Sequence, residues 1–141
     1  MSAPTTDTGP VLLEETSGSV RILTLNRPAK KNALSDDRVD AVVERMARAA
    51  ADEAVRVVGL TGAGDAFCSG ADLALRKPAN GRPEHRRDAT EQAVRLVTGI
   101  RVECEKPVVA GIGGIAIGAG LSLALCADMR IASAKARFHR G

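Results

Sequence analysis

Residues 55–73 read VRVVGLTGAGDAFCSGADL, and this stretch does most to decide the fold. It opens on an apolar, β-branched run, Val55 to Thr61, whose length fits a buried strand that a pair of glycines then ends. Gly70 allows a tight turn, and Asp72 could cap a short helix that starts at Leu73. Ligands of α/β proteins bind outside the carboxyl ends of parallel strands. The loop is therefore a candidate site, although a plain strand-to-helix turn also explains the pattern.

A second strand, glycine cluster and helix follow at residues 107–128, PVVAGIGGIAIGAGLSLALCAD. Backbone N–H groups near Ala119 would face a ligand from a helix N-terminus, where the dipole favours negative charge. The N–H of Ala71 in the first loop would also point outward. Two convergent donors suit a carbonyl oxygen that gains negative charge, where the loss of one donor costs about 10²–10³ in rate. Together the two loops predict an oxyanion site.

A dinucleotide-binding site is the rival interpretation of the second loop. Gly111 to Ala116 matches the pattern G-x-G-x-x-A. The acidic residue expected about 20 positions later could only be Asp128, which precedes the next expected strand, whereas a ribose-binding acid lies at the far end of that strand. We therefore place the nicotinamide-dehydrogenase reading below the oxyanion site. The chain also lacks the Gly-Lys-Ser/Thr phosphate loop and the G-x-S-x-G nucleophile turn.

Strands and helices alternate along the rest of the chain. We expect a polar, flexible lead over residues 1–10, followed by a hairpin from Val11–Glu15 and Val20–Leu25 with a four-residue turn. A helix should run from Ser35 to about Ala51, and an exposed basic flap at Arg76–Asp88 should precede a second helix at Ala89–Cys104. A small-residue helix should end near Ala127, and a strand should follow at Met129–Ala132. The order β-β-α-β-α-β-α-β predicts a mostly parallel sheet in an α/β fold.

Composition excludes several classes of protein. The chain has 141 residues, of which 45% are apolar and 26% charged, as is ordinary for one globular domain. Its net charge of +3 is modest, and with two Phe, no Trp and no Tyr it has little with which to stack bases, so we expect no nucleic-acid partner. It has no apolar run of about 20 residues and no secretory signal, so we expect no membrane association and a cytoplasmic location. The three cysteines do not pair closely in the sequence, so we expect no disulfide framework. The His, Cys and acidic residues do not have the spacing of metal ligands, so we expect no metal site.

Three segments in a fixed order make the chain resemble the enoyl-CoA hydratase/isomerase (crotonase) family. They are LNRPAKKNAL at 25–34, AFCSGADL at 66–73, and IGAG at 117–120 leading to Ala127-Asp128. The resemblance implies an α/β fold with a crotonase-like ββα spiral core, of which residues 11–141 form the N-terminal part, truncated before the C-terminal helices. It implies an acyl-CoA thioester as substrate, with coenzyme A entering as part of that substrate and no separate cofactor. It also implies a homotrimer or a dimer of trimers.

The resemblance also assigns site residues. The N–H groups of Ala71 and Ala119 correspond to the oxyanion hole that holds the thioester enolate. Residues of two segments, with one glycine of the last loop, correspond to the walls around the coenzyme: Arg27, Lys30, Lys31, Ala33, Cys68, Ser69, Gly70, Asp72, Leu73 and Gly118. Basic residues among them suit phosphates.

One catalytic position departs from the family. Hydratases of the family carry a glutamate two residues after the last glycine of the second loop, and here that position is Ser122, which cannot act as a carboxylate base. The second acidic position of the family falls beyond Gly141. We expect 2-enoyl-CoA hydration or double-bond isomerisation, with isomerisation favoured by Ser122. The alternative is a non-catalytic acyl-CoA-binding protein or an inactive fragment.

Overall fold

The computed structural model describes residues 9–72 and 84–140, which form a mixed α/β fold. Thirteen elements follow one another along these residues: β1 (Leu12–Ser17), β2 (Val20–Leu25), the 3-10 turn η1 (Pro28–Lys30), α1 (Asp36–Ala51), β3 (Val57–Gly62), β4 (Ala66–Cys68), α2 (Glu84–Val97), the π-helix η3 (Thr98–Val102), β5 (Val108–Ile112), β6 (Ile115–Ile117), α3 (Ala119–Cys126), β7 (Met129–Ala132) and β8 (Arg137–His139). None of the helices in these ranges is both long and apolar enough to cross a membrane.

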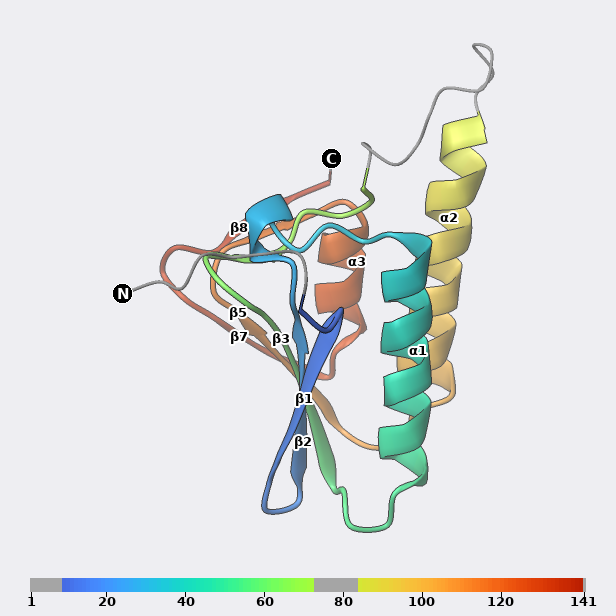
Figure 1. The fold of residues 1–141 in the computed structure, drawn as a ribbon, viewed down its shortest axis with the longest axis vertical. Coiled ribbons are helices and arrows are strands. Elements are labelled where there is room, and N and C mark those ends of the chain that lie inside the picture. Colours follow the sequence, from blue (N-terminus) through green and yellow to red (C-terminus); the bar gives the residue numbers. More distant parts are fainter. Residues whose placement is uncertain (1–8, 73–83, 141) are drawn as a thin grey trace.

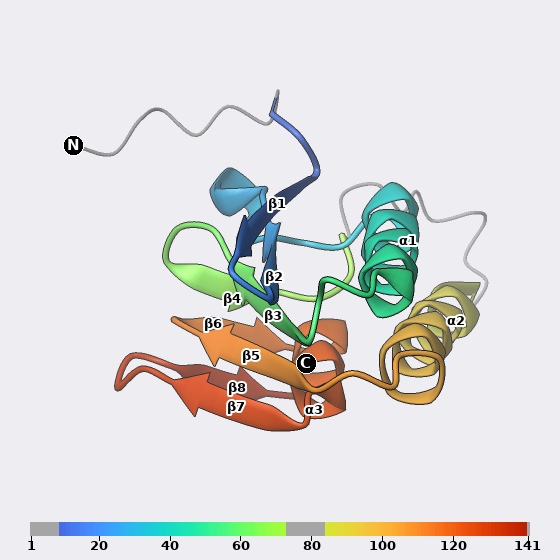
Figure 2. The same ribbon diagram turned by 90° about the horizontal axis from the view of Figure 1, so that it is seen from below.

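The strands form two sheets (Figure 1 and Figure 2). The larger has the order β1-β2-β3-β5-β7, with β1 antiparallel to β2 and every other pair parallel. The smaller has the order β4-β6-β8 and is parallel throughout. Because β3-β4-α2 and β5-β6-α3 each send one strand to either sheet and then a helix, the chain advances through a repeated ββα unit. This arrangement confirms the ββα core, and the parallel pairing confirms the predicted α/β class.

The helices lie on one side of the five-stranded sheet, with α1 and α2 side by side (Figure 1 and Figure 2). The spacing of the apolar residues in α1 predicts one apolar face, made of Val39, Val42, Val43, Met46 and Ala50. Val39, Val42 and Met46 are fully buried, and Val43 and Ala50 are partly buried against the core. Ser35 begins this helix as predicted, although its side chain makes no capping hydrogen bond, and its carbonyl oxygen instead accepts the N–H of Val39 at 3.0 Å. Burial of this face joins α1 to the core beneath the sheet.

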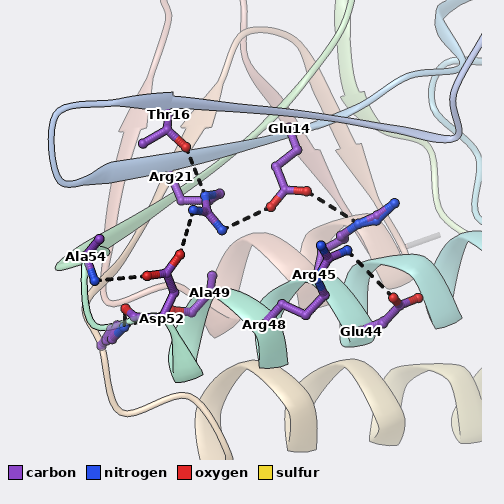
Figure 3. A network of polar contacts seen from close by, with 10 residues as sticks. Glu14, Thr16, Arg21, Glu44, Arg45, Arg48, Ala49, Asp52 and Ala54 are labelled. Atoms are coloured by element: carbon purple, nitrogen blue, oxygen red, sulfur yellow. Dashed lines mark hydrogen bonds and ion pairs between the residues drawn. The ribbon is translucent and has the colours of Figure 1, made fainter.

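A polar network attaches the β1–β2 hairpin to α1 (Figure 3). The Arg21 guanidinium donates to Thr16, to Glu14 at 3.2 Å and to Asp52 at 2.9 Å, and Glu14 also pairs with Arg45 of α1. These contacts attach the hairpin to α1.

The C-terminal end of α1 has a second attachment. The Lys106 ammonium donates to the carbonyl oxygen of Ala49 at 2.8 Å and to that of Asp52. These two carbonyls also accept the N–H groups of Asp52 and Val55, so the lysine adds a charged donor to each, and it opposes the negative end of the helix dipole.

Several predicted elements need correction. Ser17 pairs with Val20, so the hairpin turn has two residues rather than four, with Gly18 at φ +59. The second long helix starts at Glu84 rather than at residue 89 and changes to a π-helix at Thr98, so the predicted flap was wrong over residues 84–88. Residues 76–83 of that flap, and residues 1–8 of the predicted lead, lie outside the described residues.

The second sheet was not predicted. Its strands have three residues each and lie inside or beside the glycine loops. A three-residue strand is too short for the alternation of apolar and polar side chains that reveals longer strands.

Candidate functional site

The segment between β2 and α1 is organised by Asn32. Its side chain is 1% exposed and its backbone takes a left-handed conformation, with φ +57. The Oδ1 atom accepts the N–H of Arg27 at 2.8 Å, while Nδ2 donates to the carbonyls of Ala63 and Ala66, both at 2.9 Å. One buried amide therefore connects the end of β2 to the turn between β3 and β4.

The first glycine loop runs beside this segment. Leu34 donates its N–H to the carbonyl of Gly70 at 2.7 Å, and the N–H of Asp72 donates to the carbonyl of Leu34 at 2.9 Å. These two bonds form a parallel bridge between Leu34 and Ala71. In a parallel bridge the middle residue turns its own N–H away from the partner strand, so the Ala71 N–H points to the opposite side from Leu34.

The second glycine loop enters α3. Gly118 has φ +57 and ψ −121, its N–H donates to the carbonyl of His139 at 3.0 Å, and its own carbonyl accepts the N–H of Ser122 at 3.1 Å. That last bond is the first of the helix. The N–H groups of Ala119 and the next two residues therefore precede the helical hydrogen bonds and point out of the N-terminus.

The two loops are in direct contact, and glycines make the contact possible. A Cβ on Gly70 would lie 2.7 Å from the carbonyl oxygen of Ile117 and 3.4 Å from the amide nitrogen of Ala119. A Cβ on Gly120 would lie 2.2 Å from the carbonyl oxygen of Cys68. The structure thus brings together the two loops whose N–H groups were predicted to converge, with the backbone of Ala119 against the residue that precedes Ala71.

The predicted coenzyme-contacting basic residues differ in how they are held. The Arg27 guanidinium pairs with Asp72, and both side chains are largely buried. The Lys31 ammonium lies 3.0 Å from Asp65, and both of these side chains are well exposed, so an anionic ligand could compete for Lys31. Lys30 is exposed at the end of the 3-10 turn.

Asp72 therefore has a partner that the sequence did not reveal. Its predicted role as a helix cap depends on a helix from Leu73, which lies outside the described residues. What the structure shows instead is a carboxylate held by an arginine from a different segment.

The side chains of Cys68 and Ser69 hold the first loop in its conformation. Cys68 is fully buried, and burial raises the pKa of its thiol to about 12, so it stays protonated and is a poor nucleophile. Its Sγ donates to the carbonyl of Asn32 at 3.3 Å and accepts the N–H of Gly70 at 3.4 Å. Ser69 donates its hydroxyl to the carbonyl of Lys30 at 3.3 Å. These bonds hold the first loop against the segment that contains Asn32.

Two further predicted residues lie next to the two loops. Ala33 is buried beside the bridge. Ser122 is half-buried on the first turn of α3, where its hydroxyl donates to the carbonyl of Gly118 at 3.4 Å. Across the described ranges no group of His, Cys, Asp and Glu is placed to hold a metal ion.

Comparison with known proteins decides the family. The enoyl-CoA hydratase/isomerase family matches residues 15–140. The chain belongs to this family. All three sequence segments and both contacting loops lie inside the match, which confirms the resemblance.

Relatives within the enoyl-CoA hydratase/isomerase family are close in sequence and structure. The chain is 39% identical over 133 residues to the probable enoyl-CoA hydratase echA12 of Mycobacterium leprae, covering 91% of this chain and 45% of the relative. It is 40% identical over 131 residues to the probable enoyl-CoA hydratase EchA14 of Mycobacterium tuberculosis, covering 92% and 49%. A solved Pseudomonas aeruginosa protein superposes with a TM-score of 0.82 at 42% identity, covering 94% and 56%. The chain thus spans about half the length of these relatives.

Asn32 and the Arg27–Asp72 pair are the features that sequence reasoning missed. Asn32 lies within LNRPAKKNAL, and no structural role is predicted for it from the sequence, although asparagine is enriched in left-handed turns and such a turn is a signal that could reveal one. The Arg27–Asp72 pair joins residues 45 positions apart, and no local pattern signals it.

Proposed function

We propose that this protein binds an acyl-CoA thioester and stabilises the enolate form of that thioester through the N–H groups of Ala71 and Ala119. The observation that carries the proposal is the backbone contact between the two loops, with Gly70 against the amide nitrogen of Ala119. Two N–H donors from rigid loops can meet one oxygen, and they act most strongly on charge that develops during reaction. Membership of the enoyl-CoA hydratase/isomerase family supports an acyl-CoA as the ligand.

The coenzyme portion would lie along the segment after β2 and the first loop. Lys30 and Lys31 offer exposed ammonium groups for phosphates, and Lys31 would exchange its surface pair with Asp65 for a more highly charged partner. Surface pairs of this kind contribute little, so the exchange would cost little. Cys68, Ser69 and the glycines of both loops would contribute backbone to the walls.

Ser122 directs the choice among reactions. A serine hydroxyl at neutral pH cannot remove a proton from water as a carboxylate does. We therefore favour double-bond isomerisation of a 2-enoyl-CoA over hydration, with the base supplied by another residue. Binding without turnover is the second candidate, and the same serine favours it. As the family resemblance implies, we expect a homotrimer or a dimer of trimers.

Proline at position 119 offers a direct test. Ala119 is the first residue of α3, where proline is tolerated because no helical bond uses that N–H. A119P deletes the proposed donor and leaves the helix intact, whereas A119G keeps the donor. We would measure binding of crotonyl-CoA, a short 2-enoyl thioester, by calorimetry and its conversion by chromatography of the products.

The outcomes separate the candidates. Conversion that falls about 10²–10³-fold in A119P and stays within a few-fold in A119G supports the oxyanion role. Binding of crotonyl-CoA without conversion by the unaltered protein favours the binding protein. Absence of binding, or equal conversion by both variants, would overturn the proposal.

A further inference from the structure

The ion pair between Arg27 and Asp72 stands next to the proposed oxyanion site. The two side chains are 13% and 6% exposed, so the pair is largely removed from water. Buried ion pairs lose much hydration and often add little net stability, so a pair in such a place calls for a role other than stability. Asp72 directly follows Ala71, whose N–H is one of the two proposed donors.

The direction of the Ala71 N–H depends on its two neighbours. Gly70 and Asp72 are each bonded to Leu34, at 2.7 and 2.9 Å, and this bridge turns the Ala71 N–H to the side opposite Leu34. The bonds of Cys68 and Ser69 hold the loop before Ala71, whereas after Ala71 the bridge by itself would let the backbone twist about Leu34. The side chain of Asp72 removes that freedom because it is fastened to a residue outside the bridge.

Arg27 is itself held in place. Its backbone N–H donates to Oδ1 of Asn32 at 2.8 Å, and Asn32 is fixed through Nδ2 to the turn between β3 and β4. The guanidinium therefore extends from an anchored backbone to the carboxylate of Asp72. The chain beyond Ala71 is tied to the same framework as the chain before it.

We propose that the Arg27–Asp72 ion pair is a positioning pair, which aims the Ala71 N–H at the thioester carbonyl oxygen. This inference rests on the proposed function and adds to it two residues that touch no reacting atom. A misplacement of about 1 Å in a reacting geometry costs about 10²-fold in rate, so loss of the pair should lower kcat by that order while KM changes only a few-fold.

The stretching frequency of the bound thioester carbonyl depends directly on how the Ala71 N–H is oriented toward the carbonyl oxygen. Its measurement requires that the thioester binds, and it does not require turnover. We would bind crotonyl-CoA labelled with ¹³C at the thioester carbonyl to the full chain and record the infrared stretch. Hydrogen bonds from the two N–H groups lower this frequency below its value in water. In D72N we expect the frequency to return part of the way toward that value and kcat to fall about 10²-fold.

Two further variants complete the design. D52N removes the carboxylate that pairs with Arg21 at 2.9 Å in the hairpin network, far along the chain from Ala71, and should leave the carbonyl frequency unchanged. D72N removes the carboxylate that pairs with the largely buried Arg27 guanidinium and could fail to fold. The double variant R27M/D72N leaves no unpaired buried charge, and it should show the same displaced frequency as D72N.

The failures are distinguishable. An unshifted carbonyl frequency in the unaltered protein, or absence of binding, overturns the proposed function and this inference with it. A lowered frequency in the unaltered protein that persists in D72N, or in the double variant where D72N does not fold, overturns the positioning role alone. If the carbonyl frequency were displaced equally in D52N, the effect would come from a general loosening of the structure, and the positioning role would be overturned as well.

Discussion

Replacing Gly120 by alanine should separate the two loops. The added Cβ would lie 2.2 Å from the carbonyl oxygen of Cys68 and 2.8 Å from its carbonyl carbon, where an ordinary contact begins near 3.4 Å. Both opposing atoms belong to backbone, so no flexible side chain can move aside. The first turn of α3 and the first loop must therefore part by about 1 Å, which is the scale at which a reacting geometry loses about 10²-fold in rate.

The expected magnitudes follow from that displacement. Overpacking in a tight interior costs about 1–3 kcal/mol of unfolding free energy, and a loss in this range would still leave a folded protein. We expect G120A to lower kcat/KM for an enoyl-CoA about 10²-fold and to lower the urea midpoint measurably. The assays are steady-state conversion of crotonyl-CoA and equilibrium unfolding in urea.

Gly113 supplies the matched control. A Cβ at this exposed glycine would meet nothing within 4 Å in the described chain. G113A should therefore be neutral, or stabilising by up to about 1 kcal/mol because alanine restricts the unfolded chain. If G120A matches G113A in both assays, the loops do not touch as the structure has them, and the reasoning for a shared site fails.

Four further outcomes follow from single side chains. N32A should cost about 3 kcal/mol or more in urea unfolding, because three backbone groups lose a buried partner. Burial raises the folded pKa of Cys68 from 9.0 to about 12, so the contribution of this thiol to the free energy of unfolding is complete below pH 9 and is lost as the pH rises toward 12. The C68A variant should therefore show a flatter dependence of the unfolding free energy on pH across that range. In the native protein, Cys68 should resist alkylation by iodoacetamide at pH 8. Asp52 has its pKa lowered from 3.8 by the Ala54 N–H and by Arg21, so its contribution is present above pH 4 and is lost as pH falls below that value; D52N should weaken the acid dependence of urea unfolding. S122E should raise hydration of crotonyl-CoA relative to S122A, measured by product chromatography, because it places a carboxylate where the family's hydratases carry a glutamate.

The long elements could be predicted because their patterns are local. The apolar spacing of Val39, Val42 and Met46 is that of a helix, and these residues are buried together as the spacing requires. The β-branched run from Val55 to Thr61 likewise corresponds to β3, shifted by two residues at its start. Burial of apolar side chains stabilises such an element over many residues, so the element forms whatever the details of its packing.

The short strands and the polar contacts could not be predicted in the same way. β4 and β6 contain three residues each and exist because they pair with each other across a gap of more than 40 positions. The contacts of Asn32 with the β3–β4 turn, and of Arg27 with Asp72, likewise join segments distant in the chain. Tertiary geometry decides all of these, and a single sequence contains no local trace of it.

A site made of backbone N–H groups leaves an unusual signature in a sequence. Every residue except proline has the donor, so Ala71 and Ala119 carry no chemical mark of their proposed role. What the sequence can show is where a side chain would obstruct the approach of one loop to the other, and those places are Gly70 and Gly120, whose Cβ atoms would lie 2.7 and 2.2 Å from opposing carbonyl oxygens. The side chains of Ala71 and Ala119 are half-buried and leave more room for change. In such a site the glycines that bear no donor role are more strictly required than the residues whose N–H groups would bind the oxygen.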